Sequence, residues 1–479
     1  MYDFIIIGAG VTGANIAREL SKYEVEVLLL EKENDVANHA TIANSAIVHS
    51  GHDPKENTLK ARLCVRGNEL YDQLEKDLNI PLLRNGAMVV AYSAEELEIL
   101  YTLYERAQKN GVDVKFLTAE EAYALEPNLN DDLMKALSLP TTKVTYPWEV
   151  AIACVENAVE NGVILKKNQA VKTIKKEDDI FIVKTKTDTF KARYVINAAG
   201  VFAENIAHMV ENNVAYKMTP RRGEYFVLDR RVKGFVNHTI YPIPSSKGKG
   251  VLLTPQVHGN ILVGPNSEFQ DEKDDVSTTK DGLTYVKIES SRLVKNIPFN
   301  RVIRTFTGVR ATINQKDFYI QESSEVSNFI HAAGIDSPGL TASPAIAEYI
   351  VNDIIKPKEN LKPKASYNPH RVYIKLFSEM NDEEKKRAYH EDHRYGRLVC
   401  KCEKITEGDI VKAIHRSVGA DTIKGIKKRA RAGSGLCQGG YCEHQVLKII
   451  ARELDMPIEE VDYYQKGTSL LYKETKVKS

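Results

Sequence analysis

The chain has 479 residues, 43% of them apolar and 27% charged, a composition typical of a soluble globular protein with two to four domains. Its 66 Lys and Arg residues nearly balance its 65 Asp and Glu residues, and a net charge of +1 argues against a nucleic-acid-binding protein. No apolar run reaches the roughly 18–20 residues of a membrane helix, and no secretory signal pattern is present. We therefore expect a cytoplasmic protein.

The first elements form a βαβ unit. Residues 3–8 predict an apolar strand, residues 11–22 a helix and residues 25–30 a second apolar strand. Further along, the pattern predicts helices at 55–76, 94–109 and 147–161, and strands at 162–165, 171–174, 180–184 and 194–196.

Strands dominate the next part of the chain, and a proline-marked segment follows it. The predicted strands are 223–228, 250–254, 260–263 and 329–333, and a helix is predicted at about 344–355. Residues 356–370 carry three prolines among charged residues, which is typical of a linker. Charged residues continue to about 397, and a compact C-terminal unit ends the chain.

A glycine motif connects the first strand to the first helix. Gly8 permits a tight turn, Gly10 lets a pyrophosphate approach the backbone, and Gly13 allows close packing of helix against strand. Glu31 ends the second strand, where a carboxylate can bind ribose hydroxyls. Together these features predict a dinucleotide site, although the motif alone does not distinguish FAD from NAD.

Two later segments favour FAD. Residues 197–200 (NAAG) follow a buried strand, and residues 334–346 form a loop that enters a helix, whose N-terminus can support negative charge on a reduced flavin. An early glycine motif with such late segments resembles the FAD-dependent D-amino-acid oxidase superfamily. The resemblance implies an α/β fold with a discontinuous, glutathione-reductase-like FAD-binding Rossmann domain. A mainly antiparallel β-sheet substrate domain (α+β) is inserted in it.

The same resemblance implies further FAD contacts from several loops. These are Asn44, Val171, Ala199, Gly200, Gly334, Gly339, Leu340 and Thr341.

Within the superfamily, residues 1–355 most resemble the glycerol-3-phosphate oxidase and dehydrogenase group. The segments that carry this resemblance are 43–51 (ANSAIVHSG), 221–225 (RRGEY), 248–250 (GKG), 264–265 (GP), 306–310 (FTGVR) and 337–341 (SPGLT). Relatives that oxidise L-2-hydroxyglutarate share the segment around His49 and the segment 59–67. Ala46 departs from the Ser or Gly of relatives, which leaves the assignment of His49 intact.

Two residues of the 43–51 segment are predicted active-site residues, His49 as the catalytic residue and Ser45 as a substrate contact. His49 suits a general base because the ordinary pKa of histidine lies near the operating pH. The resemblance implies that His49 accepts the proton of the substrate's C2 hydroxyl and that Ser45 lines the same pocket.

Several cations are candidates for binding the substrate's anionic group. The guanidinium of Arg310 matches a phosphate or a carboxylate, and the resemblance implies the phosphate. Lys249 and Ser337 are further predicted contacts. One of the adjacent Arg221 and Arg222 is expected to be structural, and Arg222 is the predicted substrate residue.

Four of the six cysteines are predicted ligands of one centre. Cys400-x-Cys402 and Cys437-x4-Cys442 flank a helical segment, and four thiolates can hold zinc or an iron–sulfur cluster. The unit resembles a bacterioferritin-associated-ferredoxin-like (BFD-like) [2Fe–2S] domain; zinc and an empty or redox thiol site are the alternatives. The two other cysteines, Cys64 and Cys154, are predicted to be buried structural thiols.

Two local features of this C-terminal unit also give predictions. Thr406 followed by Asp409 predicts a helix N-cap. The basic run 427–431 predicts a solvated helix face or a face for an acidic partner.

The predicted domain division follows from these motifs. The FAD-binding domain comprises residues 1–75, 141–215 and 329–356, and the substrate domain comprises 76–140 and 216–328. Residues 357–396 are the linker, and 397–479 are the BFD-like domain with a C-terminal tail.

The sequence therefore predicts oxidation of sn-glycerol 3-phosphate to dihydroxyacetone phosphate by hydride transfer to FAD. Because an iron–sulfur cluster moves electrons one at a time, we expect the electrons of the reduced flavin to pass through the [2Fe–2S] cluster to an electron-accepting flavoprotein or a quinone-linked partner subunit. The alternatives are a dehydrogenase of L-2-hydroxyglutarate, another 2-hydroxyacid or an amino acid, or an oxidase with a structural zinc docking module. We expect contact with a membrane only through a partner.

Overall fold

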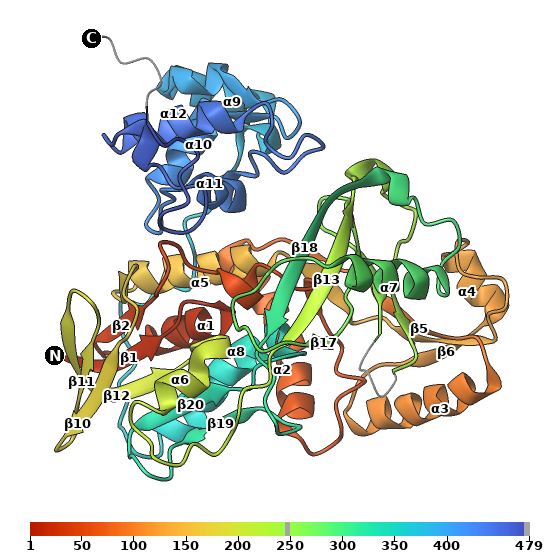
Figure 1. Ribbon diagram of the computed structural model, residues 1–479, viewed down its shortest axis with the longest axis horizontal. Helices are drawn as coiled ribbons and strands as arrows, with labels where there is room; N and C mark the ends of the chain where they lie inside the picture. Colours follow the sequence, from red (N-terminus) through yellow and green to blue (C-terminus); the bar gives the residue numbers. More distant parts are fainter. Residues whose placement is uncertain (245–249, 474–479) are drawn as a thin grey trace.

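A mixed sheet whose central strands are parallel forms the first domain of the computed structural model, which describes residues 1–244 and 250–473 (Figure 1). In spatial order its strands are β10 (Thr173–Glu177), β11 (Ile180–Lys184), β12 (Thr189–Asn197), β1 (Tyr2–Ile7), β2 (Val27–Leu30) and β9 (Ile164–Lys166). The strand β20 (Phe329–Ala333) also pairs with β12 in parallel, and β19 (Tyr319–Glu322) pairs with β20. This parallel-sheet domain therefore joins distant parts of the chain, as the resemblance implied.

Helices cover the parallel sheet because its central strands are apolar on both faces. The side chains of Phe4, Ile6 and Leu29 pack in one cluster with the helices, whereas Ile5 and Leu28 pack on the other face. The covering helices are α1 (Val11–Leu20), α2 (Leu59–Leu78), α5 (Pro147–Glu160), α6 (Ala203–Ala207) and α8 (Gly339–Tyr349).

The helix α8 begins earlier than the sequence predicts. Its bounds are Gly339–Tyr349, followed by a π-helical turn over residues 350–355, so Pro344 lies inside the helix. Proline cannot donate to the carbonyl of Leu340 one turn earlier. The hydroxyls of Tyr71 and Ser343 donate to that carbonyl instead, at 2.9 and 2.8 Å. The helix thus tolerates the proline, and Gly339 becomes its first residue.

A second, mainly antiparallel sheet forms the inserted domain. In spatial order its strands are β17 (Glu268–Phe269), β13 (Arg221–Leu228), β16 (Ile261–Gly264), β15 (Leu252–Pro255), β14 (Thr239–Pro242), β5 (Ala87–Ala91), β7 (Lys135–Leu139) and β6 (Lys115–Thr118), and β18 (Val302–Arg310) pairs with β13. The helices α3 (Ala94–Lys109), α4 (Ala119–Leu125) and α7 (Lys280–Ser291) belong to this antiparallel-sheet domain.

A small sheet lies between the two large ones. It comprises β3 (Ile47–Val48), β8 (Lys143–Thr145) and β4 (Leu82–Leu83). The pairing of Ile47 with Val144 fixes the chain just before His49.

The C-terminal domain is small and mainly helical. Its elements are β21 (Leu398–Cys400), β22 (Ile405–Thr406), α10 (Glu407–Ile414), α11 (Ile423–Ala430) and α12 (Glu443–Glu453). The predicted N-cap is confirmed, because Thr406 and Asp409 form a capping box at the start of α10.

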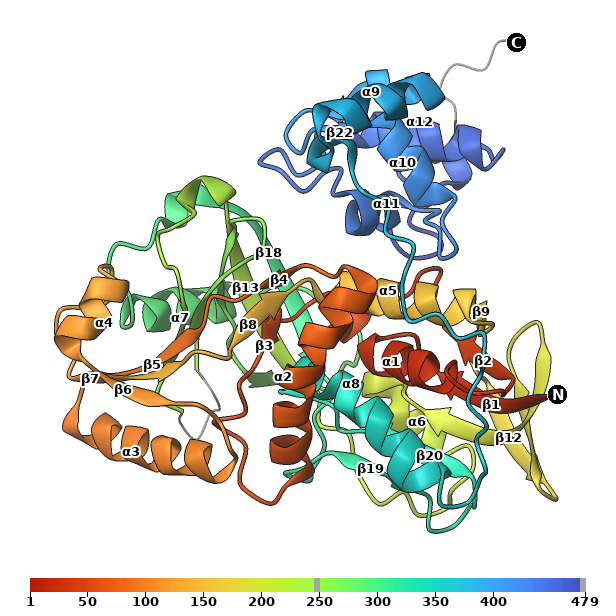
Figure 2. The ribbon, with the colours of Figure 1, turned by 180° about the vertical axis from the view of Figure 1, so that it is seen from behind.

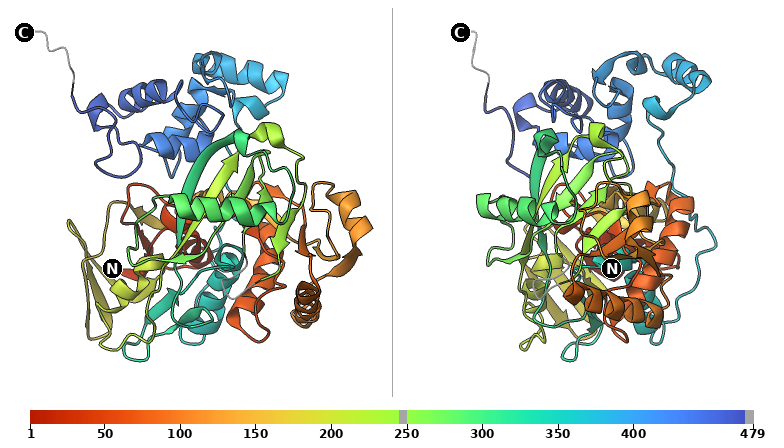
Figure 3. Two further views of the ribbon diagram at one scale, coloured as in Figure 1. Left: turned by 45° about the vertical axis from the view of Figure 1, so that its right-hand side comes forward. Right: turned by 90° about the vertical axis from the view of Figure 1, so that its right-hand side faces the viewer.

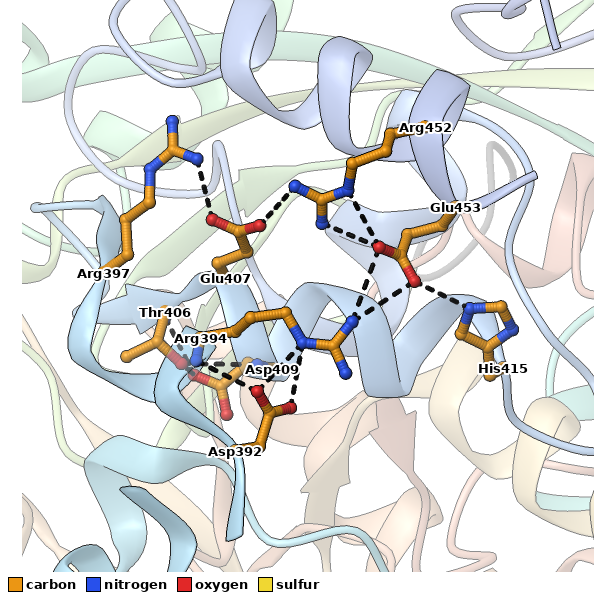
Figure 4. Close-up of polar contacts among 9 residues, drawn as sticks. All are labelled: Asp392, Arg394, Arg397, Thr406, Glu407, Asp409, His415, Arg452 and Glu453. Carbon is orange, nitrogen blue, oxygen red and sulfur yellow. Dashed lines mark hydrogen bonds and ion pairs between the residues drawn. The ribbon is translucent and has the colours of Figure 1, made fainter. Parts of the chain in front are cut away.

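The segment before this domain is attached to it. Residues 382–397 contain α9 (Asp382–Glu391), and Arg394 contacts both Asp392 at 2.9 Å and Glu453 of α12 at 3.4 Å (Figure 4). Arg397 contacts Glu407 of α10 at 2.8 Å. These ion pairs hold the end of the predicted linker against the C-terminal domain.

The proline-marked segment runs along the parallel-sheet domain (Figures 2 and 3). The amide of Glu24 donates to Lys362 O, and the amide of Lys364 donates to Lys22 O, each at 2.8 Å. Farther along, Arg371 is buried and contacts Glu156 of α5 at 2.6 Å. The segment is therefore fixed to the body of the protein.

A buried ion cluster holds the C-terminal domain against the parallel-sheet domain. Asp35, in the loop after β2, contacts Lys428 at 2.6 Å and both terminal nitrogens of Arg429 at 2.8 and 2.9 Å. All three side chains are at most 3% exposed. The prediction of a solvated face for the run 427–431 is therefore wrong, because two of its cations are buried against a carboxylate of another domain.

We predict that Asp35→Asn weakens this domain contact. The change leaves two buried cations without their counter-charge, and breaking a buried ion pair costs about 3–5 kcal/mol. We expect a lower melting temperature and faster proteolysis within residues 356–375.

The exposed Asp382 is a suitable control, because its side chain is 94% exposed. Asp382→Asn should leave the melting temperature and the cleavage rate unchanged. Identical behaviour of Asp35→Asn and the wild type would contradict a structural role for the ion cluster.

Candidate active site

A cavity of about 450 Å³ lies between the parallel and antiparallel sheets. One part of its lining comes from the loops at the N-termini of α1 and α8, and another part from β13 and β18. Among the residues singled out from the sequence, the lining includes Gly10, Asn44, Ser45, His49, Gly200, Arg310, Ser337, Gly339 and Leu340. The fold thus gathers residues from five separate segments of the chain at one cavity.

The glycine motif forms the turn that opens α1. Gly8 has φ of +105°, and a Cβ on Gly13 would lie 1.9 Å from Gly8 O. Only glycine fits either position, because a side chain at Gly13 would overlap the backbone. The N-cap of α1 is Gly10, which has no side chain to occupy the helix N-terminus. That end of α1 therefore suits the pyrophosphate of a dinucleotide.

Glu31 completes this end of the site. Its carboxylate accepts hydrogen bonds from the amides of Ala9 at 2.8 Å and Glu33 at 3.0 Å. Burial raises the pKa of this carboxyl above its ordinary value. The side chain is held at the carboxyl end of β2, where a ribose would lie in a dinucleotide-binding fold.

Other predicted FAD residues shape the cavity from behind. Ala199 and Gly334 adjoin lining residues, and Thr341 Oγ1 accepts a hydrogen bond from the amide of His49 at 2.9 Å. Val171 packs in the apolar cluster on the other face of the sheet and does not line the cavity. The donors, glycines and helix ends present therefore fit FAD.

Asn44 stabilises the loop that leads to His49. Its amide group donates to Ala40 O and Thr41 O, each at 3.0 Å, and its side-chain oxygen accepts from Ala46 N at 2.7 Å. Ala46 has φ of +63°, in the left-handed region. The sequence motif thus encodes a strained loop that Asn44 holds from within.

His49 is buried and its ring contacts a tyrosine. The Tyr241 hydroxyl lies 2.9 Å from His49 Nδ1, and His49 O accepts from Asn68 Nδ2 at 3.0 Å. Burial raises the pKa of Tyr241 well above its ordinary value, so its hydroxyl stays protonated. The imidazole is therefore oriented by backbone and side-chain contacts at the cavity wall. No sequence motif pointed to Tyr241.

Arg310 provides a positive charge at the same cavity. Its guanidinium donates to Asn266 O at 3.1 Å and to Arg222 O at 3.4 Å, and it has no carboxylate partner among residues 1–244 and 250–473. A Cβ on Gly308 would lie 1.9 Å from Ala43 O, so this glycine lets β18 approach the loop of His49. The guanidinium is therefore held by neutral backbone acceptors, a setting suited to binding an anion.

The two adjacent arginines of β13 point in different directions, as alternate residues of a strand do. Arg221 lines the cavity. Arg222 is not part of the lining; it pairs with Asp275 and donates a hydrogen bond of 2.8 Å to Gln270 Oε1. The geometry thus favours Arg221 over the predicted Arg222 as the substrate contact. Lys249 lies outside the described residues.

Two hydroxyls and one further aromatic ring complete the lining. Ser45 Oγ lies 3.2 Å from the Tyr225 hydroxyl, and the Tyr225 ring stacks on Phe306 with centroids 4.6 Å apart. Ser337 lies just before α8. Tyr225 belongs to the RRGEY segment, so the motif was noticed in the sequence although this residue was not singled out.

The four C-terminal cysteines form two pairs. Cys402 Sγ lies 4.0 Å from Cys437 Sγ, and a hydrogen bond from Cys442 lowers the pKa of Cys400. Among the described residues, no three His, Cys, Asp or Glu side chains converge as a group able to hold a metal ion. Each pair joins one cysteine of each motif, an arrangement that fits two irons with two thiolates each.

The cysteine loops face the other domains. Arg230 of the antiparallel-sheet domain donates to Cys402 O at 2.6 Å, and Arg431 donates to the Tyr146 hydroxyl at 2.7 Å. Cys64 and Cys154 are buried elsewhere, which confirms the prediction that both thiols are buried.

Comparisons with known proteins define the class of this protein. Residues 3–352 match the family described as FAD dependent oxidoreductase, and residues 398–452 match the BFD-like [2Fe-2S] binding domain. The chain therefore belongs to the FAD dependent oxidoreductase family, and its cofactors are FAD and a [2Fe–2S] cluster. These findings confirm the predicted fold and cofactors.

Individual relatives cover much of the chain. It is 43% identical over 477 residues to glycerol 3-phosphate dehydrogenase of Caloramator mitchellensis, with 99% of each chain covered. The solved L-alpha-glycerophosphate oxidase of Mycoplasma pneumoniae with FAD bound is 30% identical, with a TM-score of 0.74, and the match covers 78% of this chain and 99% of that one. L-2-hydroxyglutarate dehydrogenase of Escherichia coli strain K12 is 31% identical over 56% of this chain and 64% of its own.

The described part of the chain contains no helix that is both long and apolar enough to cross a membrane.

We predict that Cys437→Ser lowers the iron and sulfide content of the purified protein, because serine is a poorer ligand than a thiolate. FAD content should not change, since the cysteine lies in a separate domain. Metal analysis and visible absorption measure both quantities. Cys154→Ala is the matched control, and it should retain iron and sulfide; equal cluster content in the two variants would contradict the assignment of Cys437.

Proposed function

We propose that the protein oxidises sn-glycerol 3-phosphate to dihydroxyacetone phosphate and passes the electrons through its [2Fe–2S] domain to a partner. The observation that carries this proposal is that His49 and Arg310 line the same cavity. The Arg310 guanidinium has no carboxylate partner among the described residues. A base and an anion-binding cation are what a phosphorylated alcohol requires. The similarity to glycerol 3-phosphate dehydrogenase over nearly the whole chain supports the same substrate.

In this proposal, His49 removes the hydroxyl proton of the substrate. When Nδ1 carries the ring proton and donates to Tyr241 Oη, Nε2 is the basic nitrogen. The contacts of its backbone with Thr341 and Asn68 fix the main chain at His49, and the contact with Tyr241 orients the imidazole. When bound, the flavin would accept the hydride that leaves the carbon atom bearing this hydroxyl.

Arg310 and Arg221 bind the phosphate. Their Cα positions pair across β18 and β13, so two guanidinium groups belong to one edge of the cavity. A planar guanidinium can donate two parallel hydrogen bonds to phosphate oxygens. Ser45 and Ser337 line the space between phosphate and hydroxyl, and Lys249 is proposed as an additional cation.

The [2Fe–2S] domain exports electrons one at a time. The proposed acceptor is a flavoprotein or a quinone-linked partner subunit, because an oxidase that delivers electrons directly to oxygen needs no cluster. We propose that the protein works in the cytoplasm and contacts a membrane only through that partner.

L-2-hydroxyglutarate is the second candidate substrate. The similarity to L-2-hydroxyglutarate dehydrogenase over about half of the chain favours it, and Arg310 suits a carboxylate as well as a phosphate. Anaerobic mixing of the holoenzyme with each compound distinguishes the two. Flavin bleaching by glycerol 3-phosphate alone supports the proposal, and bleaching by L-2-hydroxyglutarate alone would overturn the substrate assignment.

We predict that His49→Ala slows flavin reduction by at least about 10²-fold, the usual scale for loss of a general base. The measurement is anaerobic stopped-flow absorption at saturating glycerol 3-phosphate. Tyr241→Phe removes only the hydroxyl next to Nδ1 and should have a smaller effect. If His49→Ala reduced the flavin at the wild-type rate, another group would have to take the proton.

We predict that Arg310→Ala mainly raises KM for glycerol 3-phosphate, by roughly tenfold to a hundredfold, because a hydrogen-bonded charge contributes about 1.5–3 kcal/mol. Arg310→Lys should restore part of the loss, since it keeps the charge without the planar fork.

Arg222→Ala is the matched control for this prediction. Its partner is Asp275 rather than the cavity, so KM should change little. A larger effect of Arg222→Ala than of Arg310→Ala would contradict the proposed phosphate site.

A further inference from the structure

A second cavity, of about 820 Å³, lies where the C-terminal domain meets both large domains. Its lining includes residues of α5, β18 and α11, and Ala43 and Asn44 line both this cavity and the active-site cavity. On the other side, it includes Gln438, the residue after the cluster ligand Cys437. The cavity thus lies between the loop of residues 43–51, which contains His49, and the loop that contains Cys437. The proposed function assigns this cavity no role.

Cations outnumber carboxylates around this second cavity. The cations are Lys32, Arg304, Lys424, Lys427, Lys428, Arg431 and Lys466; the carboxylates are Glu33, Glu149 and Asp274. Three of the cations are paired: Lys32 with Glu33, Lys428 with Asp35 and Arg431 with Glu403.

Lys424, Lys427 and Arg304 have no ion-pair partner in the described part of the chain. Lys427 Nζ instead donates to Gln438 Oε1 at 3.1 Å. Burial, Arg304 and Lys428 together lower the pKa of Lys424 to about 8. The two lysines are partly desolvated, whereas Arg304 is exposed, and the three like charges repel one another, a situation that a bound anion would relieve.

An aromatic wall faces this group of cations. The Tyr146 ring lies 4.5 Å from Trp148 and 4.8 Å from His258, centroid to centroid, and each pair is tilted by 30°. The Trp148 indole is fixed by a hydrogen bond from Nε1 to Lys428 O at 3.2 Å. Lys424 Nζ lies 4.2 Å from the ring centroid of Tyr464, which also lines the cavity.

We propose that this interdomain cavity binds a phosphorylated ligand with a planar ring, of the size of a mononucleotide. Lys424, Lys427 and Arg304 would bind the phosphate, and Trp148 and Tyr146 would contact the ring. The volume lies within the range of about 300–1,000 Å³ found for small-molecule sites. The proposal concerns a site separate from the substrate cavity and does not depend on which alcohol is oxidised.

The chain offers a direct optical test, because Trp148 is its only tryptophan. The FAD- and cluster-loaded protein, with excess FAD, is titrated with adenosine, nicotinamide and flavin mononucleotides, and Trp148 emission is recorded. Equilibrium dialysis with the same probes gives the stoichiometry. We expect at least one of them to bind with one site per chain and to change the emission, and inorganic phosphate to compete with it.

Variants assign the bound probe to this cavity. Lys424→Gln and Lys427→Gln should each weaken binding about tenfold, the scale of one charged hydrogen bond. Lys427→Arg, unlike Lys427→Gln, should bind the probe with nearly wild-type affinity because it keeps the positive charge. Lys448→Gln, at an exposed position of α12 outside the cavity lining, should bind like the wild type, and so should Arg310→Ala.

Three outcomes would overturn the proposal. One is that none of the probes shows saturable binding at concentrations up to about 1 mM, because a dissociation constant above this value corresponds to only weak contacts. Another is unchanged affinity in both lysine variants. The third is loss of binding in Arg310→Ala alone, which would place the probe in the substrate cavity.

Discussion

The contact on which the arrangement of the molecule depends is the buried cluster of Asp35, Lys428 and Arg429. Asp35 lies a few residues after Glu31, so the same loop at the carboxyl end of β2 holds the predicted FAD-binding acid and the anchor of the C-terminal domain. Buried charges tolerate little displacement, because each would otherwise lose its partner in a medium of low dielectric constant. The cysteine loops are thereby held in a fixed position beside the flavin-binding domain.

The loop that contains His49 is the second constraint. It is held from within by Asn44, from α8 by Thr341, and on the side of β18 by the close approach at Gly308. Through these contacts, His49 of the first domain and Arg310 of the inserted domain line the same cavity. The same loop also lines the interdomain cavity through Ala43 and Asn44.

The sequence predicted what short-range chemistry determines. The glycine motif and the cysteine spacing constrain the backbone or the ligand set locally, so they led to both cofactors. It predicted less well what depends on side-chain direction or on distant partners. Strand alternation turns Arg221 rather than Arg222 toward the cavity, and Lys428 is buried only because Asp35 lies opposite it. Tyr241 belongs to no sequence motif that was recognised. Its hydroxyl contacts His49 Nδ1 only because the inserted sheet brings the two residues together.

We propose that electrons from glycerol 3-phosphate leave the protein through the [2Fe–2S] cluster. Rapid anaerobic mixing of the holoenzyme with this substrate, followed by freezing and electron paramagnetic resonance, tests it most directly. We expect the flavin to bleach first and the signal of the reduced cluster then to grow until it represents a substantial fraction of the chains. A bleached flavin beside a cluster that stays oxidised, with rapid formation of peroxide once oxygen is admitted, would contradict it.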